Sequence, residues 1–207
     1  MYKFQCSMDN INSGHPFRKA FFLIFLSVLS YVFLDRELLP LIGKPPFPLW
    51  KVFSFLIYPP LHLVFWAGAF IIARTKQNHW TLPLFEITVS QCLSIAFARV
   101  FKILFGRARP EIFLKKGIYG FHGLEWNHHY HSFPSGHTLT AFTLATSLSY
   151  IFPRFRVLFY SLATLLSLSR PLLLDHYLSD VIATASIGII IASIVHIMTR
   201  RIHYETT

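Results

Sequence analysis

Long apolar stretches, separated by short polar segments, make up most of the 207-residue chain. A helix that crosses about 30 Å of hydrocarbon needs roughly 20 mainly apolar residues. Runs of about this length predict six transmembrane helices at residues 19–34, 50–73, 82–105, 135–152, 157–174 and 178–198. No internal repeat or long linker divides the chain, so residues 1–207 are predicted to form one all-α, integral membrane bundle of six helices.

Composition supports the membrane assignment. Hydrophobic residues make up 54% of the chain and charged residues only 14%, which is unusual for a soluble domain. The formal net charge of +10 raises the possibility of nucleic-acid binding, but the cations lie in short segments between apolar runs rather than along a basic stripe. We therefore expect a membrane protein with no nucleic-acid partner; its oligomeric state stays open.

The distribution of cations predicts an orientation. Cytoplasmic segments of membrane proteins carry an excess of lysine and arginine. In a six-span arrangement one side carries Lys3, Arg18, Lys19, Arg74, Lys76, Arg154, Arg156, Arg200 and Arg201. This side is predicted to be cytoplasmic, with both termini, although the other side also carries many cations.

Prolines mark two irregular regions. Pro59 and Pro60 fall inside the second apolar run and predict a kink there. The first outer loop is predicted at residues 39–49 and contains Pro40, Pro45, Pro46 and Pro48.

Three polar clusters lie at the outer ends of predicted spans. In the first, Lys102 and Arg109 are seven residues apart, so a third helix extended by two turns would place both cations on one face. In the second, Ser135 and Gly136 precede an apolar run, where a hydroxyl can cap the helix and free backbone N–H groups can hold a phosphate. Either feature alone has a plain alternative, an interfacial cation or a simple helix cap.

The third cluster contains a histidine and an aspartate four residues apart, His176 and Asp180. On one helix face the carboxylate would accept a hydrogen bond from one ring nitrogen and leave the other free to attack. His137 could then supply a proton to a departing oxygen, and Arg170 could donate to phosphate oxygens. Taken alone, His176 and Asp180 could equally be an ordinary hydrogen-bonded pair.

Together the clusters read Lys102-x6-Arg109-Pro110, Pro134-Ser135-Gly136-His137 and Ser169-Arg170-x5-His176-x3-Asp180. This pattern resembles the three-part motif of the type-2 phosphatidic acid phosphatase superfamily, without a gap or a substitution. The resemblance implies that His176 forms a phosphohistidine, that Asp180 orients it and that His137 protonates the leaving group. It also implies phosphoryl-binding roles for Lys102, Arg109, Ser135, Gly136 and Arg170, followed by attack of water.

The resemblance implies no metal and no other cofactor, and the third cluster has too few carboxylates for a metal cage. His122, His128, His129 and His131 lie in the long segment 106–134 without cysteine partners, and we expect loop packing or headgroup contact there, although zinc binding or pH sensing is conceivable. Ionisable residues within apolar runs are expected to be hydrogen-bonded inside the bundle; these are His62, Glu86 and His196.

The leading interpretation is a metal-independent lipid phosphatase with its site at the outer face of a bacterial inner membrane. The substrate could be undecaprenyl diphosphate, phosphatidylglycerophosphate, phosphatidic acid or a lipid A phosphate, since the motifs contact only the phosphoryl group. Other interpretations are a phosphotransferase with another lipid as acceptor, a non-catalytic phosphate-binding protein and a vanadium-dependent haloperoxidase. The short chain without a further domain is similar to bacterial members.

Overall fold

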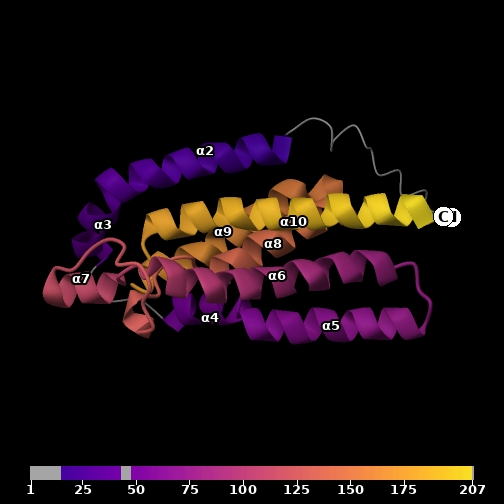
Figure 1. The fold of residues 1–207 in the computed structure, drawn as a ribbon, viewed down its shortest axis with the longest axis horizontal. Coiled ribbons are helices and arrows are strands. Elements are labelled where there is room, and N and C mark those ends of the chain that lie inside the picture. Colours follow the sequence, from indigo (N-terminus) through magenta and orange to yellow (C-terminus); the bar gives the residue numbers. More distant parts are fainter. Residues whose placement is uncertain (1–14, 43–47, 207) are drawn as a thin grey trace.

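The computed structural model describes residues 15–42 and 48–206, and every regular element in these ranges is helical. The loop from Gly106 to Pro134, α3 and α7 gather at one end of a long bundle, and the α5–α6 connection lies at the other (Figure 1). The elements are α2 (His15–Leu29), η1 (Ser30–Leu34), α3 (Asp35–Ile42), α4 (Pro48–Leu56), α5 (Pro59–Thr75), α6 (Thr81–Phe105), α7 (Pro110–Lys116), η2 (His128–Tyr130), α8 (Gly136–Ile151), η3 (Pro153–Phe155), α9 (Arg156–Leu172) and α10 (Leu178–Thr206).

Four helical segments are long and apolar enough to cross a membrane: Pro16–Ile42, Pro48–Thr75, Thr81–Phe105 and Leu178–Ile202. The two other predicted spans correspond to α8 and α9, which have 16 and 17 residues. At 1.5 Å per residue they reach only about 25 Å, less than the hydrocarbon thickness. The protein is thus an all-helical integral membrane protein, and the count of six spans remains a prediction.

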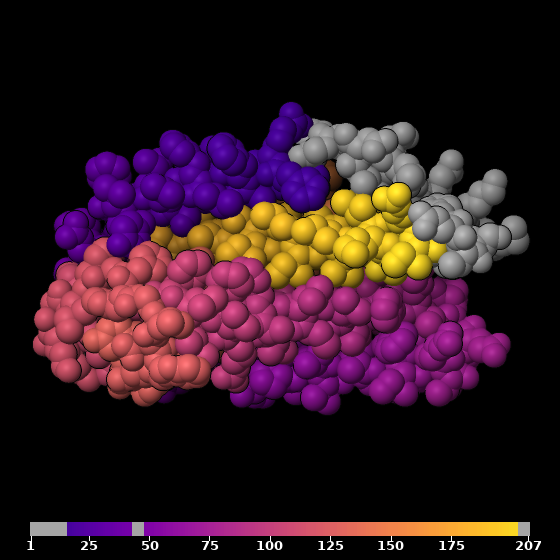
Figure 2. Space-filling model, in the orientation of Figure 1, coloured from indigo at the N-terminus to yellow at the C-terminus, as the bar shows by residue number. Residues whose placement is uncertain are grey.

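Helix α10 lies at the centre of the bundle and packs against α2, α6, α8 and α9. Figure 2 shows α10 as a yellow band between α2 and α6. Its contact with α8 is close at Gly188, where an added Cβ would lie 3.0 Å from the Cβ of Phe142 and 3.1 Å from the backbone nitrogen of Thr143. An added side chain there would be tighter than most Cβ contacts, so the two helices would have to move apart by a few tenths of an ångström.

Most residues of helix α8 are buried, and most of these buried residues are small or carry a hydroxyl group. Thr143 donates to the carbonyl of Leu139, and Thr146 donates to that of Phe142, so these hydroxyls are satisfied inside their own helix. Small side chains allow helix backbones to approach closely where lipid offers no hydrophobic driving force between helices. This packing fixes the N-terminal end of α8, where the second motif lies.

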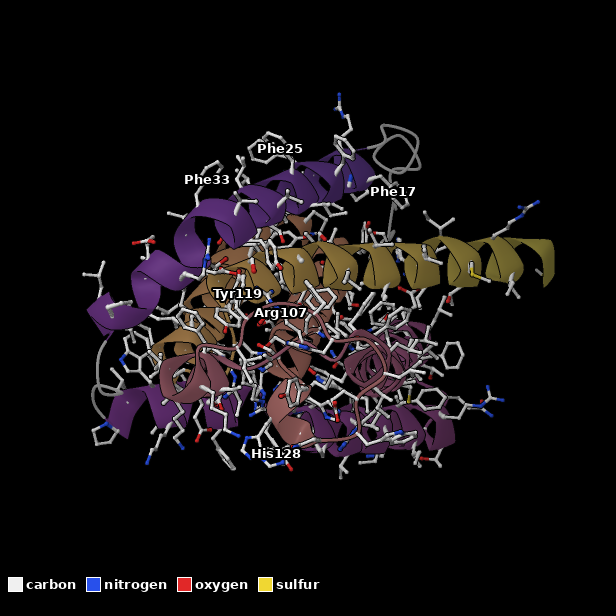
Figure 3. The ribbon with its side chains drawn as sticks, turned by 60° about the vertical axis from the view of Figure 1, so that its left-hand side comes forward. Phe17, Phe25, Phe33, Arg107, Tyr119 and His128 are labelled. Atoms are coloured by element: carbon white, nitrogen blue, oxygen red, sulfur yellow. The ribbon has the colours of Figure 1, made fainter. Side chains whose placement is uncertain are left out.

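Large apolar side chains cover the outside of the bundle. Phe21 is 75% exposed and Phe33 is 65% exposed, and Phe25 and Phe33 point away from the bundle in Figure 3. A water-exposed surface of this kind would be costly, whereas lipid tails accommodate it.

The irregularity predicted as a kink at Pro59 and Pro60 is a break between two helices, because α4 ends at Leu56 and α5 begins at Pro59. The predicted loop 39–49 is partly wrong. Helix α3 continues to Ile42 with Pro40 inside it, and α4 begins at Pro48. Pro45 and Pro46 lie outside the described residues.

The ionisable residues within apolar runs do have polar partners. Nδ1 of His196 lies 2.8 Å from Oε2 of Glu86, and Nε of Arg200 lies 3.1 Å from Oε1 of the same carboxylate. His62 Nε2 lies 2.7 Å from the carbonyl oxygen of Leu56. Glu86 and His196 are therefore intrabundle partners, as predicted, and the pair joins α6 to α10.

Candidate active site

The first motif lies where α6 ends. Gly106 adopts a left-handed conformation with φ +50° and terminates the helix, and an added Cβ would lie 2.1 Å from the carbonyl oxygen of Gly123. The predicted extension of this helix by two turns is therefore wrong. Lys102 remains on α6, whereas Arg109 belongs to the following loop and precedes α7.

Two arginines from different motifs share one carboxylate. Arg170 Nη2 donates to Asp175 Oδ2 over 2.8 Å, and Arg109 Nη1 lies 3.5 Å from Asp175 Oδ1. Arg170 also donates to the hydroxyl of Ser54 on α4. The buried Nε–H groups of Arg109 and Arg170 have no acceptor within the described part of the chain. These donors are suited to bind the oxygens of an anion.

Lys102 completes a group of three cations. Arg109 and Arg170 both act electrostatically on Lys102, and all three act on His137 and on His176. The structure thus brings together residues from all three sequence motifs. Such a concentration of positive charge favours a phosphate.

The N-terminus of α8 forms another side of this group. Ser135 caps the helix, since its Oγ accepts a hydrogen bond from Thr138 N, as predicted. Its own backbone N–H donates to Thr184 Oγ1 over 3.1 Å and is not available to a ligand. The next N–H groups, those of Gly136 and His137, belong to the first helical turn and have no intrahelical acceptor.

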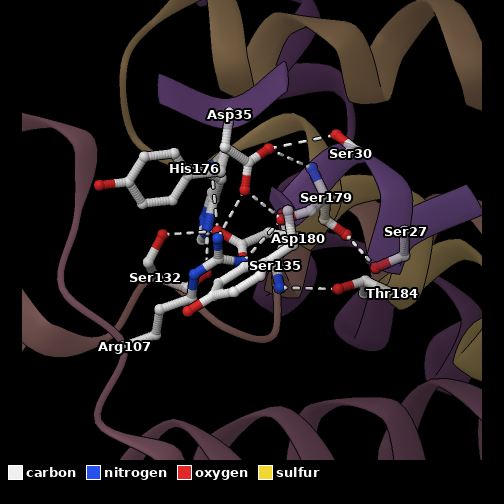
Figure 4. A network of polar contacts seen from close by, with 12 residues as sticks. Ser27, Ser30, Asp35, Arg107, Ser132, Ser135, His176, Ser179, Asp180 and Thr184 are labelled. Carbon is white, nitrogen blue, oxygen red and sulfur yellow. Dashed lines mark hydrogen bonds and ion pairs between the residues drawn. The ribbon is translucent and has the colours of Figure 1, made fainter. Parts of the chain in front are cut away.

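His176 lies in the turn before α10 and not on the helix itself. The prediction that it shares a helix face with Asp180 is wrong. Instead, Nδ1 of His176 forms a hydrogen bond with the backbone carbonyl of Ser132 (Figure 4). A carbonyl only accepts, so Nδ1 carries the proton and Nε2 carries the lone pair.

His176 is 2% exposed. Burial, and then the nearby cations Arg170, Lys102 and Arg109, hold the pKa of His176 well below its usual value. The ring is consequently neutral at neutral pH and can act as a nucleophile.

Asp180 contacts the support of His176 rather than His176 itself. Its Oδ2 accepts from Ser132 Oγ at 2.6 Å and from Tyr177 N at 2.9 Å, and its Oδ1 forms an ion pair with Arg107. Ser132 thereby connects the carboxylate to the histidine, with its hydroxyl on one and its carbonyl on the other.

Sequence reasoning missed Arg107 and Asp35. Arg107 is 1% exposed and contacts both Asp180 and Asp35, with Nη2 2.6 Å from Asp35 Oδ2. The ring centroids of Tyr31 and Tyr177 lie 4.9 and 4.6 Å from the guanidinium carbon of Arg107. Burial alone would lower the pKa of Arg107, but Asp180 and Asp35 raise it. A buried aspartate at the end of an apolar run was the available signal.

The four loop histidines do not form a cluster with a metal-binding arrangement. Among the described residues, no group of three histidine, cysteine or acidic side chains could hold a metal ion. His131 Nε2 contacts the carbonyl of Glu125 at 2.9 Å, and the ring of His122 packs edge-on against Tyr130. The ring centroids of His128 and His129 are 4.0 Å apart, and the two rings are tilted by 35°. Metal independence stays a prediction.

Fold and site together define a helical membrane protein with a buried, neutral histidine beside three cations at one end of the bundle. Residues 83–204 match the family model of the PAP2 superfamily, and the chain belongs to this superfamily. The resemblance read from the three motifs is confirmed.

Two curated relatives have the same name. A lipid A 1-phosphatase of Rhizobium johnstonii is 31% identical over 141 residues, which cover 65% of this chain and 58% of the relative. A lipid A 1-phosphatase of Rhizobium etli is 37% identical over 91 residues, which cover 44% of this chain and 39% of the relative. The chain thus matches about half the length of these proteins.

The crystal structure of Aquifex aeolicus LpxE is similar to this fold. It superposes with a TM-score of 0.54 and 29% sequence identity, and the match covers 78% of this chain and 94% of the LpxE chain.

Proposed function

We propose that this protein is a bacterial membrane lipid phosphatase that works through a phosphohistidine on His176. The carrying observation is the hydrogen bond from His176 Nδ1 to the Ser132 carbonyl, which leaves Nε2 unprotonated on a ring that Lys102, Arg109 and Arg170 influence electrostatically. Membership of the PAP2 superfamily and the names of the relatives support this assignment.

In the first step, the lone pair of Nε2 attacks phosphorus and the bond from phosphorus to the lipid oxygen breaks. His137, at the N-terminus of α8, donates a proton to the departing oxygen, so a lipid phosphomonoester leaves as an alcohol and a lipid diphosphate leaves as the lipid monophosphate. The three cations and the N–H groups of Gly136 and His137 offset the negative charge that the transition state spreads over the phosphoryl oxygens.

In the second step, water attacks the phosphohistidine. His137, now lacking a proton, accepts one from this water, and the bond from phosphorus to Nε2 breaks. Inorganic phosphate leaves, and His176 returns to its neutral form with the proton still on Nδ1. Atoms and charges balance without a metal or another cofactor.

Lipid A that carries a 1-phosphate is the first substrate to test, because both curated relatives are lipid A 1-phosphatases. The site residues are proposed to bind the phosphoryl group and not the lipid tail, so undecaprenyl diphosphate, phosphatidylglycerophosphate and phosphatidic acid belong in the same panel.

The site lies at the bundle end opposite the α5–α6 connection (Figure 1). Arg74 in the last turn of α5 and Lys76 just after it lie at the connection end of the bundle, which the positive-inside rule assigns to the cytoplasm. The proposed site therefore faces the periplasm or the outside, where a lipid can keep its tail in the membrane while its phosphate binds.

The experiment is phosphate release by the full chain in detergent with a chelator, from each lipid of the panel, for wild type and His176→Ala. Release by wild type and none by His176→Ala supports the proposal. Turnover by His176→Ala, or no release from any lipid, overturns it. Transfer of the phosphoryl group to another lipid, in place of its release as inorganic phosphate, would identify a phosphotransferase.

A further inference from the structure

We propose that Asp35, on the first helical segment, is a positioning residue for the nucleophile and acts through Arg107, Asp180 and Ser132. This inference rests on the proposed function, because it assigns a task to residues that surround His176. None of the motif residues predicts it, since Asp35 lies 67 positions before Lys102 in the chain.

The first argument is that Asp35 caps α10 from another helix. The first turn of any helix has N–H groups without intrahelical acceptors, and a side chain normally satisfies one of them. Tyr177 precedes α10, and its side chain cannot accept a hydrogen bond from the N–H groups of this turn. Asp35 Oδ1 instead accepts from Ser179 N at 3.0 Å, and its Oδ2 accepts from Ser179 Oγ.

The second argument concerns Asp180, which completes the same turn. Its Oδ2 accepts from Tyr177 N, three residues earlier, as the acidic residue of a capping box does. The first turn of α10 is thus capped by two carboxylates, that of Asp180 from α10 itself and that of Asp35 from α3. Arg107 connects them, because its Nη1 donates to both Ser179 Oγ and Asp180 while Nη2 binds Asp35.

Asp35 itself is firmly held. It follows a π-helical turn, η1, in which its backbone N–H donates to the carbonyl of Ser30 five residues earlier. Ser30 Oγ and Tyr119 OH also donate to its carboxylate, at 3.2 Å each. Single π-helical turns within α-helices often occur at functional sites, and here the turn brings Ser30 and Asp35 together.

The connection to the reacting atom then takes two further contacts. Asp180 accepts from Ser132 Oγ, and the Ser132 carbonyl fixes the proton of His176 on Nδ1. Figure 4 shows this continuous set of contacts from Ser30 and Asp35 to His176. A loss of Asp35 should therefore leave the phosphate-binding cations in place and disturb the aim of Nε2.

The buried charged cluster of Asp35, Arg107 and Asp180 is a poor way to stabilise a fold alone. Asp35 and Asp180 are 2% and 0% exposed, and desolvating such groups offsets much of what their ion pairs contribute. Removing Arg107 would leave two unpaired buried anions. Removing the charge of Asp35 leaves Arg107 and Asp180 as a neutral pair, so Asp35→Asn is the variant suited to a functional test.

The test compares wild type, Asp35→Asn and Glu37→Gln, which changes an exposed acid on the same helix. We expect Asp35→Asn to lower kcat by about 10- to 100-fold, as for a misaligned reacting group, with KM and the inhibition constant of inorganic phosphate within about twofold. Glu37→Gln should match wild type. Unchanged kcat in a folded Asp35→Asn protein, or a raised KM at unchanged kcat, overturns the inference.

A second readout separates this inference from the proposed function. Nitrogen-15 NMR of labelled histidines reports the tautomer of His176 without any turnover, with His176→Ala used for assignment. We expect one Nδ1–H tautomer in wild type and a mixture of tautomers in Asp35→Asn. The same single tautomer in both proteins overturns the positioning role, whereas an inactive wild type overturns only the proposed function.

If Asp35→Asn does not fold, Ser179→Ala replaces it. This variant removes the hydroxyl that contacts Asp35 and Arg107 but keeps every charge and the backbone bond from Ser179 N. It should show a smaller fall in kcat with the same KM, and an unchanged kcat overturns the inference.

Discussion

The backbone carbonyl of Ser132 accepts a hydrogen bond from Nδ1 of His176. Ser132 lies in the loop that follows the first motif, and its own N–H donates to the carbonyl of Arg107 over 3.0 Å. A main-chain group is a suitable support for a nucleophile because it cannot change rotamer or protonation state. The loop between the first two motifs is therefore part of the site and not only a connection.

Replacing Ser132 by alanine should separate its two contacts. The carbonyl remains on His176, but Asp180 loses the hydroxyl that donates over 2.6 Å. A lost hydrogen bond to a buried charged group costs about 1 to 3 kcal/mol. We expect a lower unfolding temperature and a kcat reduced by about 10-fold at constant KM. Ser132→Thr, which keeps the hydroxyl, should restore most of kcat, and equal losses in both variants would argue against this role.

The ring of His176 should stay neutral in mildly acidic solution. Burial and the cations Arg170, Lys102 and Arg109 lower its pKa below the usual 6.5. Arg170→Gln removes one positive neighbour, which favours the imidazolium, so the pKa should rise towards 6.5. An NMR titration of the protein without substrate measures the pKa of His176 in wild type and in Arg170→Gln. A wild-type His176 that titrates at its usual value, or a pKa lowered further by Arg170→Gln, would contradict this electrostatic description.

Close packing of α8 on α10 predicts an intolerant glycine. Gly188→Leu places a large side chain against Phe142 and the backbone of Thr143, and overpacking of this kind costs about 1 to 3 kcal/mol or more. Gly68→Leu on α5 is the matched control, because an added Cβ there meets nothing within 4 Å. Thermal unfolding in detergent should fall for the first variant only, and equal unfolding temperatures would refute the close contact.

The Glu86 cluster should matter for stability and not for catalysis. Glu86→Ala removes the carboxylate that both His196 and Arg200 contact, and breaking a buried ion pair costs about 3 to 5 kcal/mol. Since α6 carries Glu86 about four turns from Lys102, kcat of the folded protein should stay at the wild-type value. Unfolding temperature and kcat are measured together, with Glu111→Ala as an exposed control. A large loss of kcat would show coupling between the two ends.

Sequence patterns predicted the all-helical class and the superfamily for physical reasons. Apolar runs such as that of α6 are long and end at recognisable residues, and the fixed spacing of the motif residues identifies the superfamily. Glu86 and His196 were correctly expected to have polar partners inside the bundle, because an ionisable group within a membrane span requires one; that they are each other's partners came from the structure.

The remaining features depend on contacts between distant segments. Nothing local to Asp35 identifies Arg107, 72 residues later, as its partner. The spacing of His176 and Asp180 is compatible with a helix, but α10 begins only at Leu178, and the carboxylate turns back to Tyr177 N and Arg107. Spacing within one segment could not reveal which element supplies each hydrogen bond.

The most direct test of the central claim is to trap the covalent intermediate. Wild type is mixed with lipid A labelled with phosphorus-32 in its 1-phosphate, quenched within milliseconds in alkali and digested for mass spectrometry. Phosphate on a nitrogen is stable in alkali and labile in acid. Our account predicts acid-labile label on the peptide that contains His176, absent in His176→Ala. Release of phosphate without label on His176, or label on another residue, would contradict it.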